Sequence, residues 1–334
     1  MKIKFILSII IISSLNCLYA SKPVSFDLGM ESGYFKSDIL GDRLLIRWIG
    51  RLTYAQKFEN NYINIKGRIS PDLYGSSLDA SALKLSGEIN LGGNFKTINW
   101  QTNISSRNYY YRSDRFNDVT FNIFQLGFLL NRAMSNKYSL HAGFDYFYRK
   151  NDEQPRNEID DYRYSIAAVY RLNLSNFLSC KLELEKFLIM RRKTIYTQNE
   201  NKGIRIGPVI SYNHRSKHLI NLSYELMHHS TELFDEEYWE HRIHILWGHY
   251  FTKKWSVFLF VNYLFRPDQH PDETMIELTY TSANNETGYH LKLGHDFTKS
   301  TELYFKVGYT KDELLYQNTN LAGWQYLVGM NFKF

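Results

Sequence analysis

The sequence predicts an all-β protein, an antiparallel transmembrane β-barrel of about sixteen strands, with fourteen as the alternative. Three observations predict it. Apolar and polar residues alternate with a period of two along most of the chain. The composition combines 16% aromatic residues, including 26 Tyr and 22 Phe, with a mean hydropathy of −0.41. The connections between alternating runs are longer and shorter in turn, as in barrels with short periplasmic turns and longer external loops.

The same features exclude other classes of protein. After residue 20 there is no run of roughly eighteen apolar residues, which excludes a helical membrane protein. A soluble β-sandwich has similar alternation, but its connections are not expected to be longer and shorter in turn. The sequence also has no fixed period that would indicate a repeat fold. The net charge of +6 and the pI near 9.0 suit nucleic-acid binding. However, Lys and Arg are scattered rather than clustered, so we expect no nucleic-acid partner.

Five strands are expected in the first third of the chain. The second is the clearest, because Ile46 and Trp48 alternate with Arg47 and Arg51. Tight turns are indicated at "ENN" and "GGN", and longer loops at "KSDILGD", "DLYGSSLDA" and "RNYYYRSDRF". The expected strands are residues 24–34, 43–58, 63–70, 83–91 and 97–104.

The middle third continues the pattern with five strands. In the eighth, Tyr164 and Ile166 alternate with Arg163, and Tyr170 alternates with Arg171. Turns are indicated at "RAMSNK" and "NLSN", and polar loops at "KNDEQPRNEID" and "RKTIYTQNENK". The expected strands are residues 124–130, 138–149, 162–172, 178–185 and 204–211.

The last third supplies six more strands and ends on one. Turns are indicated at "HRSK", "FTKK" and "TKST", and loops at "STELFDEEY" and "KDELLYQNTNL". Residues 266–286 are expected to form one long loop, with an extra hairpin around "MIELTYTS" as the alternative. The expected strands are residues 220–226, 239–247, 255–263, 289–297, 302–309 and 324–334.

Large rings on the apolar parity collect near the strand ends, which predicts two aromatic girdles at the membrane interfaces. The expected external girdle consists of Tyr146, Tyr148, Tyr162, Tyr164, Trp239, Tyr263 and Trp324. The expected periplasmic girdle consists of Tyr138, Tyr170, Trp255, Phe297, Phe332 and Phe334.

The first twenty residues have the layout of a cleaved secretory signal. Lys2 and Lys4 precede an apolar run, and the small residue Ala20 precedes Ser21 at the expected cleavage point. A lipoprotein signal acylated at Cys17 is the alternative. We therefore expect a signal peptide at 1–20 and a single barrel domain at 21–334. Cleavage would leave one cysteine, so no intrachain disulfide is expected.

Taken together, the signal at 1–20, the alternation over 24–334 and the final strand ending in Phe334 resemble the Gram-negative outer-membrane β-barrel class. The resemblance is to a class and not to one family. It implies location in the cell outer membrane, in contact with its lipid. It also implies that Phe334 serves as a signal to the barrel-insertion machinery.

Charged residues on the polar parity are expected to line the barrel interior, with basic groups in excess. The basic candidates are Arg47, Arg51, Lys66, Arg68, Lys84, Arg163, Arg171, Arg205, Arg242 and Lys292. The acidic candidates are Asp27, Glu31, Glu88 and Asp145. Rings of basic side chains favour anions in a narrow pore. The sequence therefore predicts a porin-like channel or transporter for small solutes, with a mild preference for anionic ones, and without a cofactor or bound metal.

Two alternatives stay open. The interior charges could instead pair across strands and fill the lumen, as in a structural, assembly or polysaccharide-export barrel with a periplasmic partner. Arg47 and Arg51 beside Asp27 and Glu31 on the first strand resemble such pairs. No segment is obviously long enough to fold inward as a porin constriction, apart from residues 266–286. The less expected alternative is a hydrolase on the external rim, using His229 and Glu237 in "MHHSTELFDEEYWEHRIH". No HExxH or GxSxG motif supports it.

Overall fold

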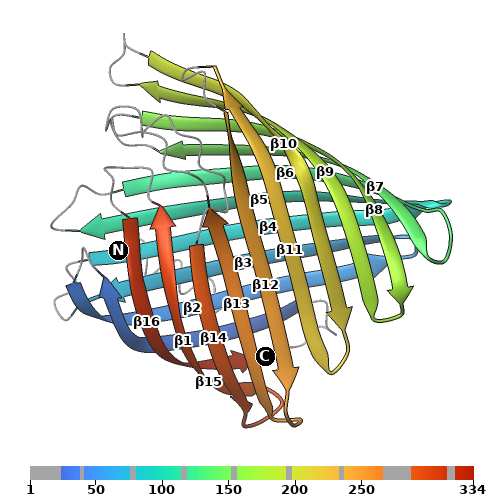
Figure 1. Cartoon of the computed structure of the whole chain (residues 1–334). Coiled ribbons are helices and arrows are strands. Elements are labelled where there is room, and N and C mark those ends of the chain that lie inside the picture. The colour runs from blue at the N-terminus through green and yellow to red at the C-terminus, as the bar shows by residue number, and fades with distance from the viewer. Residues whose placement is uncertain are drawn as a thin grey trace.

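The computed structural model contains sixteen β-strands that close into one antiparallel barrel (Figure 1). It describes residues 24–37, 41–75, 80–113, 119–151, 156–192, 198–232, 237–265, 287–313 and 320–334. The strands are β1 (Val24–Ser37), β2 (Gly41–Phe58), β3 (Asn61–Tyr74), β4 (Ala80–Phe95), β5 (Ile98–Ser113), β6 (Val119–Ala133), β7 (Tyr138–Asn151), β8 (Arg156–Asn173), β9 (Asn176–Arg192), β10 (Gln198–Arg215), β11 (His218–Thr231), β12 (Glu237–Tyr250), β13 (Trp255–Phe265), β14 (Thr287–Asp296), β15 (Thr301–Glu313) and β16 (Asn320–Lys333). Each strand pairs with its sequence neighbours, and β1 pairs with β16. The predicted class and the count of sixteen are confirmed.

Several strands extend farther toward the longer connections than the alternation predicted. The segments expected as loops at "DLYGSSLDA", "RNYYYRSDRF", "KNDEQPRNEID" and "RKTIYTQNENK" are in part strand, because β3, β5, β8, β9 and β10 continue into them. The strands beside "KSDILGD", "STELFDEEY" and "KDELLYQNTNL" also extend by one to three residues into those segments. Beyond the bilayer both faces of a strand meet water, so the ladder continues where alternation of apolar residues has stopped. The expected loop at 266–286 and the expected signal at 1–20, with Ala20 and Ser21, lie outside the described residues.

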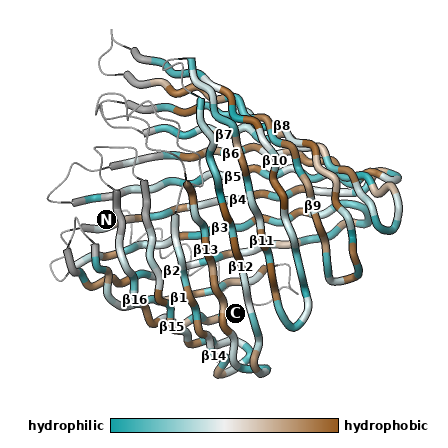
Figure 2. Tube along the Cα trace, viewed as in Figure 1, coloured by the Kyte–Doolittle hydropathy of each residue, from teal (hydrophilic) through white to brown (hydrophobic). Residues whose placement is uncertain are grey.

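The outer face of the barrel is apolar. Alternate residues on each strand are exposed and large, as the brown and teal alternation along the tube in Figure 2 illustrates. Aromatic pairs sit near both ends of this face: Tyr138 stacks on Tyr170 at 4.8 Å, and Tyr309 meets Trp324 edge-on at 5.6 Å. Such a surface matches the lipid-facing band and girdles of a transmembrane barrel. Within the described ranges, no helix is long and apolar enough to cross a membrane.

The barrel closes where the two ends of the chain meet. β1 and β16 pair from Asp27 opposite Lys333 to Ser37 opposite Gly323. Phe334 extends this pairing by one residue, since its N–H donates to the carbonyl oxygen of Phe26 at 2.9 Å. The two rings are 6.3 Å apart. Phe334 is 70% exposed on the outer face, beside the short turns.

Deleting Phe334 is expected to reduce the folded barrel in membranes several-fold, because the deletion removes its backbone hydrogen bond to Phe26 and the contact between the two rings. The conservative variant Phe334→Tyr keeps the ring and is expected to behave like the native chain. The measurement is the heat-modifiable band of the membrane fraction on unboiled gels. Equal amounts of folded native and truncated protein would contradict the prediction.

Candidate functional site

The candidate site is the inward face of the barrel wall. Every candidate residue lies on the parity opposite to the exposed apolar side chains, so all of them face inward. The structure divides them between two walls. One consists of β14 to β16 and β1 to β5, and the other of β7 to β12. In a closed barrel of sixteen strands, β2 and β10 are eight strands apart in either direction, so the centres of these walls oppose each other.

The first wall contains a group of interacting side chains that we call the Glu31 network: Glu31, Arg47, Asp72, Lys84, Tyr304 and Lys306. Arg47 binds Asp72 in a bidentate manner, with Nε donating to Oδ1 at 2.7 Å and Nη2 to Oδ2 at 2.9 Å. Its Nη1 donates to Glu31 at 3.0 Å. The sequence-based pairing of Arg47 with Glu31 is confirmed, and the carboxylates of this network are saturated.

Tyr304 carries the Glu31 network across the strand that closes the barrel. Its hydroxyl, on β15, donates to Glu31 Oε1 on β1 at 2.8 Å and therefore passes over β16. Gly329 on β16 makes this possible, since a Cβ there would lie 2.4 Å from the tyrosine ring. A polar contact thus joins the two ends of the chain on the inside, while Phe26 and Phe334 meet on the outside.

Arg51 and Arg68 form a pair of like charges on the short-turn side of the Glu31 network. They are direct cross-strand partners on β2 and β3, and both face inward. Asp27 is opposite Arg51 on β1 but makes no ion pair with it. Among the described side chains, neither arginine has a carboxylate within ion-pair range, and Arg68 is exposed. Like charges placed directly opposite each other destabilise a sheet. The wall therefore presents two guanidinium groups that a mobile anion could neutralise.

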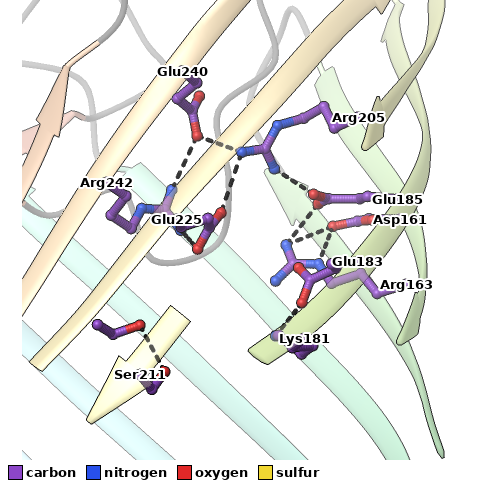
Figure 3. A network of polar contacts seen from close by, with 11 residues as sticks. Asp161, Arg163, Lys181, Glu183, Glu185, Arg205, Ser211, Glu225, Glu240 and Arg242 are labelled. Atoms are coloured by element: carbon purple, nitrogen blue, oxygen red, sulfur yellow. Dashed lines mark hydrogen bonds and ion pairs between the residues drawn. The ribbon is translucent and has the colours of Figure 1, made fainter. Parts of the chain in front are cut away.

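The second wall contains the arginine–carboxylate network of Figure 3: Asp161, Arg163, Glu185, Arg205, Glu225, Glu240 and Arg242. Arg205 on β10 is its hub and binds Glu185 on β9 and Glu240 on β12, with Glu225 at 3.6 Å. Glu185 Oε1 also forms an ion pair with Arg163 Nη2 at 2.8 Å. The network joins five consecutive strands, β8 to β12.

This second network is deeply buried. Arg205 and Glu240 are each 1% exposed, and Glu185 is fully buried. Four carboxylates face three guanidinium groups, so this wall does not have the basic excess of the first. Removing one member of a buried ionic group leaves the remaining charges uncompensated, which is far more costly than losing an exposed pair. The network therefore has a structural role in the wall, as the pairing alternative anticipated.

The remaining candidates are distributed along the interior. Lys66 pairs with Glu88 at 3.1 Å, yet the lysine side chain stays 47% exposed. Lys292 pairs with Glu302 at 2.6 Å. Asp145 lies opposite Arg163 in register on β7. Arg171 lies at the end of β8 next to the short turns, with its guanidinium 5.4 Å from the Phe177 ring, away from both networks.

Sequence reasoning missed several interacting residues, above all Asp72, Asp161 and Glu240. The sequence pattern places Asp72 in a loop and leaves Asp161 between a loop and the following strand, but β3 and β8 include them. Both could have been found by continuing the two-residue alternation past the predicted strand ends, because Asp72 is two residues from Ser70 and Asp161 is two residues from Arg163. Glu240 shares the parity of Arg242 and could have been found in the same way.

The histidines of β11 and β12 are not gathered into one site. His229 is 1% exposed and faces inward, with its ring stacked on Phe187 at 5.1 Å and on Tyr238 at 4.3 Å. Glu237 instead approaches the outward-facing His228, at 3.5 Å. Asp235 and Glu236 lie outside the described residues. Among the residues that the structure describes, no cluster of three or more His, Cys, Asp or Glu could hold a metal ion.

No protein-family model matches the chain, and no curated protein matches it. Solved structures do resemble it in fold. CdiB from Acinetobacter baumannii has a TM-score of 0.50 and 9% identity over 94% of this chain, which spans only 60% of the CdiB chain. OccAB4 from Acinetobacter baumannii gives 0.41, with 10% identity over 94% of this chain and 98% of that one. The FrpB iron transporter from Neisseria meningitidis gives 0.44, with 10% identity over 96% and 83%.

The chain therefore has the fold of the Gram-negative outer-membrane β-barrels, with no specific family recognised. The closed sheet leaves no unpaired strand edge in the bilayer. Together with the apolar outer face, this fold indicates the outer membrane as the location of the protein.

Proposed function

We propose that this protein is an outer-membrane channel for small anionic solutes. The observation that carries the proposal is the pair Arg51 and Arg68, which face the interior side by side without a carboxylate partner among the described side chains. Two of the acids near them, Glu31 and Asp72, already bind Arg47. Asp27, which is opposite Arg51, makes no ion pair with it. A passing anion would supply the missing negative charge.

Two further features support a water-filled path along this wall. Lys66, Arg68 and Arg107 are exposed although they face inward, so water reaches their charged ends. A barrel of sixteen strands is also wide enough to leave an aqueous channel. Basic side chains along such a channel attract anions and repel cations.

The test is ion selectivity in planar bilayers. The native barrel is expected to pass current and to prefer chloride to potassium in a salt gradient. The double variant Arg51→Gln/Arg68→Gln is expected to lower that preference about two- to five-fold, because an ion near the wall loses on the order of 0.5–1 kcal/mol of attraction. Reversal potentials measure the preference directly.

Lys253→Gln/Lys254→Gln is the matched control, since it removes two positive charges from a turn at the end of the barrel. It is expected to keep most of the anion preference. Selectivity that is unchanged in Arg51→Gln/Arg68→Gln would remove the role of the pair. The absence of current steps from correctly folded native protein would overturn the channel itself.

A second candidate function is an assembly or export barrel whose interior is filled and which works with a periplasmic partner. The buried arginine–carboxylate network favours it, because side chains that exclude water narrow the lumen near β8 to β12. A folded but non-conducting protein would favour this reading over the open channel. Neither candidate assigns a catalytic step to the histidines of β11 and β12.

A further inference from the structure

The end of the barrel that carries the short turns is strongly basic. We use the name basic rim for the exposed bases in the seven short turns, in the strand residues within three positions of them, and at the end of β16. They are Lys57, Lys96, Arg132, Lys137, Arg171, Arg215, Lys217, Lys253, Lys254, Lys299 and Lys333. The same positions contain only three acids, Glu59, Asp296 and Glu302, and Glu302 is paired with Lys292.

The bases of the rim are free to interact with a ligand. All eleven are exposed, and none makes an ion pair with any residue that the structure describes. Lys96 also occupies a left-handed backbone conformation, with φ of 54°, which glycine or asparagine would adopt more readily. A lysine at this turn is therefore not explained by backbone preference.

The connections at the two ends of the barrel differ in the sign of their charge. Counted by sequence in the connections alone, the seven short turns contain six Lys and Arg against one Asp or Glu, whereas the eight connections at the other end contain fourteen Asp and Glu against three Lys and Arg. A net basic composition would place bases at both ends. The sequence instead separates the signs along the barrel axis.

The distribution of the rim identifies its partner. Each of the seven short turns has at least one base in it or beside it, and these turns follow one another around the whole closed barrel (lower and right edges in Figure 1). A docked protein or solute would need bases on one side only. A complete ring directly beyond the apolar girdle of Tyr138, Trp255, Phe297 and Phe334 fits the ring of lipid headgroups that surrounds a barrel.

We propose that the basic rim binds the headgroups of anionic phospholipids in the membrane leaflet next to the short turns. Bases near an anionic membrane surface are each attracted to it, and the attraction decays within a Debye length. Long basic side chains can hold their apolar stems against the girdle while the charged ends reach the phosphates. This binding is independent of what passes through the barrel.

The test measures lipid selectivity of the full-length barrel in phosphatidylcholine vesicles with trace spin-labelled lipid. Electron paramagnetic resonance gives the fraction of label immobilised at the protein. The native barrel is expected to hold labelled phosphatidylglycerol two- to five-fold more strongly than labelled phosphatidylcholine at low salt. About 0.5 M NaCl should bring this ratio close to one, because screening shortens the range of the attraction.

Two variants with equal loss of charge separate the rim from net charge. Replacing Lys217, Lys253, Lys254 and Lys299 by Gln is expected to remove most of the preference for phosphatidylglycerol. Replacing the interior Arg51, Lys66, Arg68 and Arg107 by Gln is expected to leave it unchanged. A native ratio near one at low salt would overturn the proposal and leave the rim as a surface for an acidic protein. Equal losses in both variants would also overturn it, since net charge alone would then explain the binding.

Discussion

Replacing Arg205 by methionine is expected to lower the free energy of unfolding by about 3–5 kcal/mol. The substitution retains much of the side-chain volume but removes the guanidinium that contacts Glu185, Glu240 and Glu225. Four carboxylates, with Asp161 the fourth, would then face only Arg163 and Arg242. Because Glu185 and Glu240 are buried, water cannot replace the lost partner.

A second substitution shows whether uncompensated charge is the cause. Glu240→Gln added to Arg205→Met removes one of the stranded carboxylates and is expected to recover about 1 kcal/mol or more. Lys66→Met is the matched control, because its ion pair with Glu88 is exposed and should contribute less than about 1 kcal/mol.

Urea-dependent unfolding in lipid vesicles, followed by tryptophan fluorescence, measures all three variants. A value for Arg205→Met within about 1 kcal/mol of the native protein would show that the network is not a stabilising centre of the wall. A double variant less stable than Arg205→Met would show that Glu240 has a role beyond its charge.

The fold was predictable because the membrane imposes it on every strand. Lipid on one face and water on the other require alternation, so the parity of Trp324, Tyr326 and Val328 already placed β16 in the wall. Their exposed fractions of 47%, 44% and 53% agree with that placement. The predicted strands were too short at β3, β5, β6, β8, β9 and β10 on the side of the longer connections, where both faces of the strand meet water and the alternation disappears.

The interior contacts were predictable only across the short turns. Arg51 and Arg68 are opposite each other because the two-residue turn at Glu59 and Asn60 fixes the register of β2 and β3. Arg205 and Glu185 belong to strands joined through a longer connection, whose length does not fix a register. Their pairing could not be read from the sequence, and neither could the register across the connection of β1 to β2 that brings Arg47 to Glu31 rather than to Asp27.

Replacing Gly33 by valine is expected to prevent closure of most barrels. A Cβ on Gly33 would lie 1.8 Å from the carbonyl oxygen of Tyr326 and 2.8 Å from the Cα of Leu327, both on β16. These are backbone atoms, so a side-chain rotation cannot relieve the clash. The strands would have to separate, which breaks the ladder between β1 and β16 and exposes unpaired backbone groups in the bilayer.

The pairing of β1 with β16, which we call the seam, is especially sensitive to such a clash. β1 and β16 are the two strands farthest apart in the sequence, and their pairing is the step that turns an open sheet with two edges into a closed wall. We expect a loss of about 3 kcal/mol or more, at or beyond the upper end for overpacking a well-packed position.

Gly87→Val is the matched control for Gly33→Val, since nothing lies within 4 Å of a Cβ at Gly87 on β4. Valine also favours strand conformation, so this variant is expected to fold as well as the native chain. The folded fraction in vesicles, from the heat-modifiable band, compares the two. Normal folding of Gly33→Val would mean that β1 and β16 can move apart without opening the barrel, and equal failure of Gly87→Val would mean that the loss comes from removing glycine rather than from the clash at the seam.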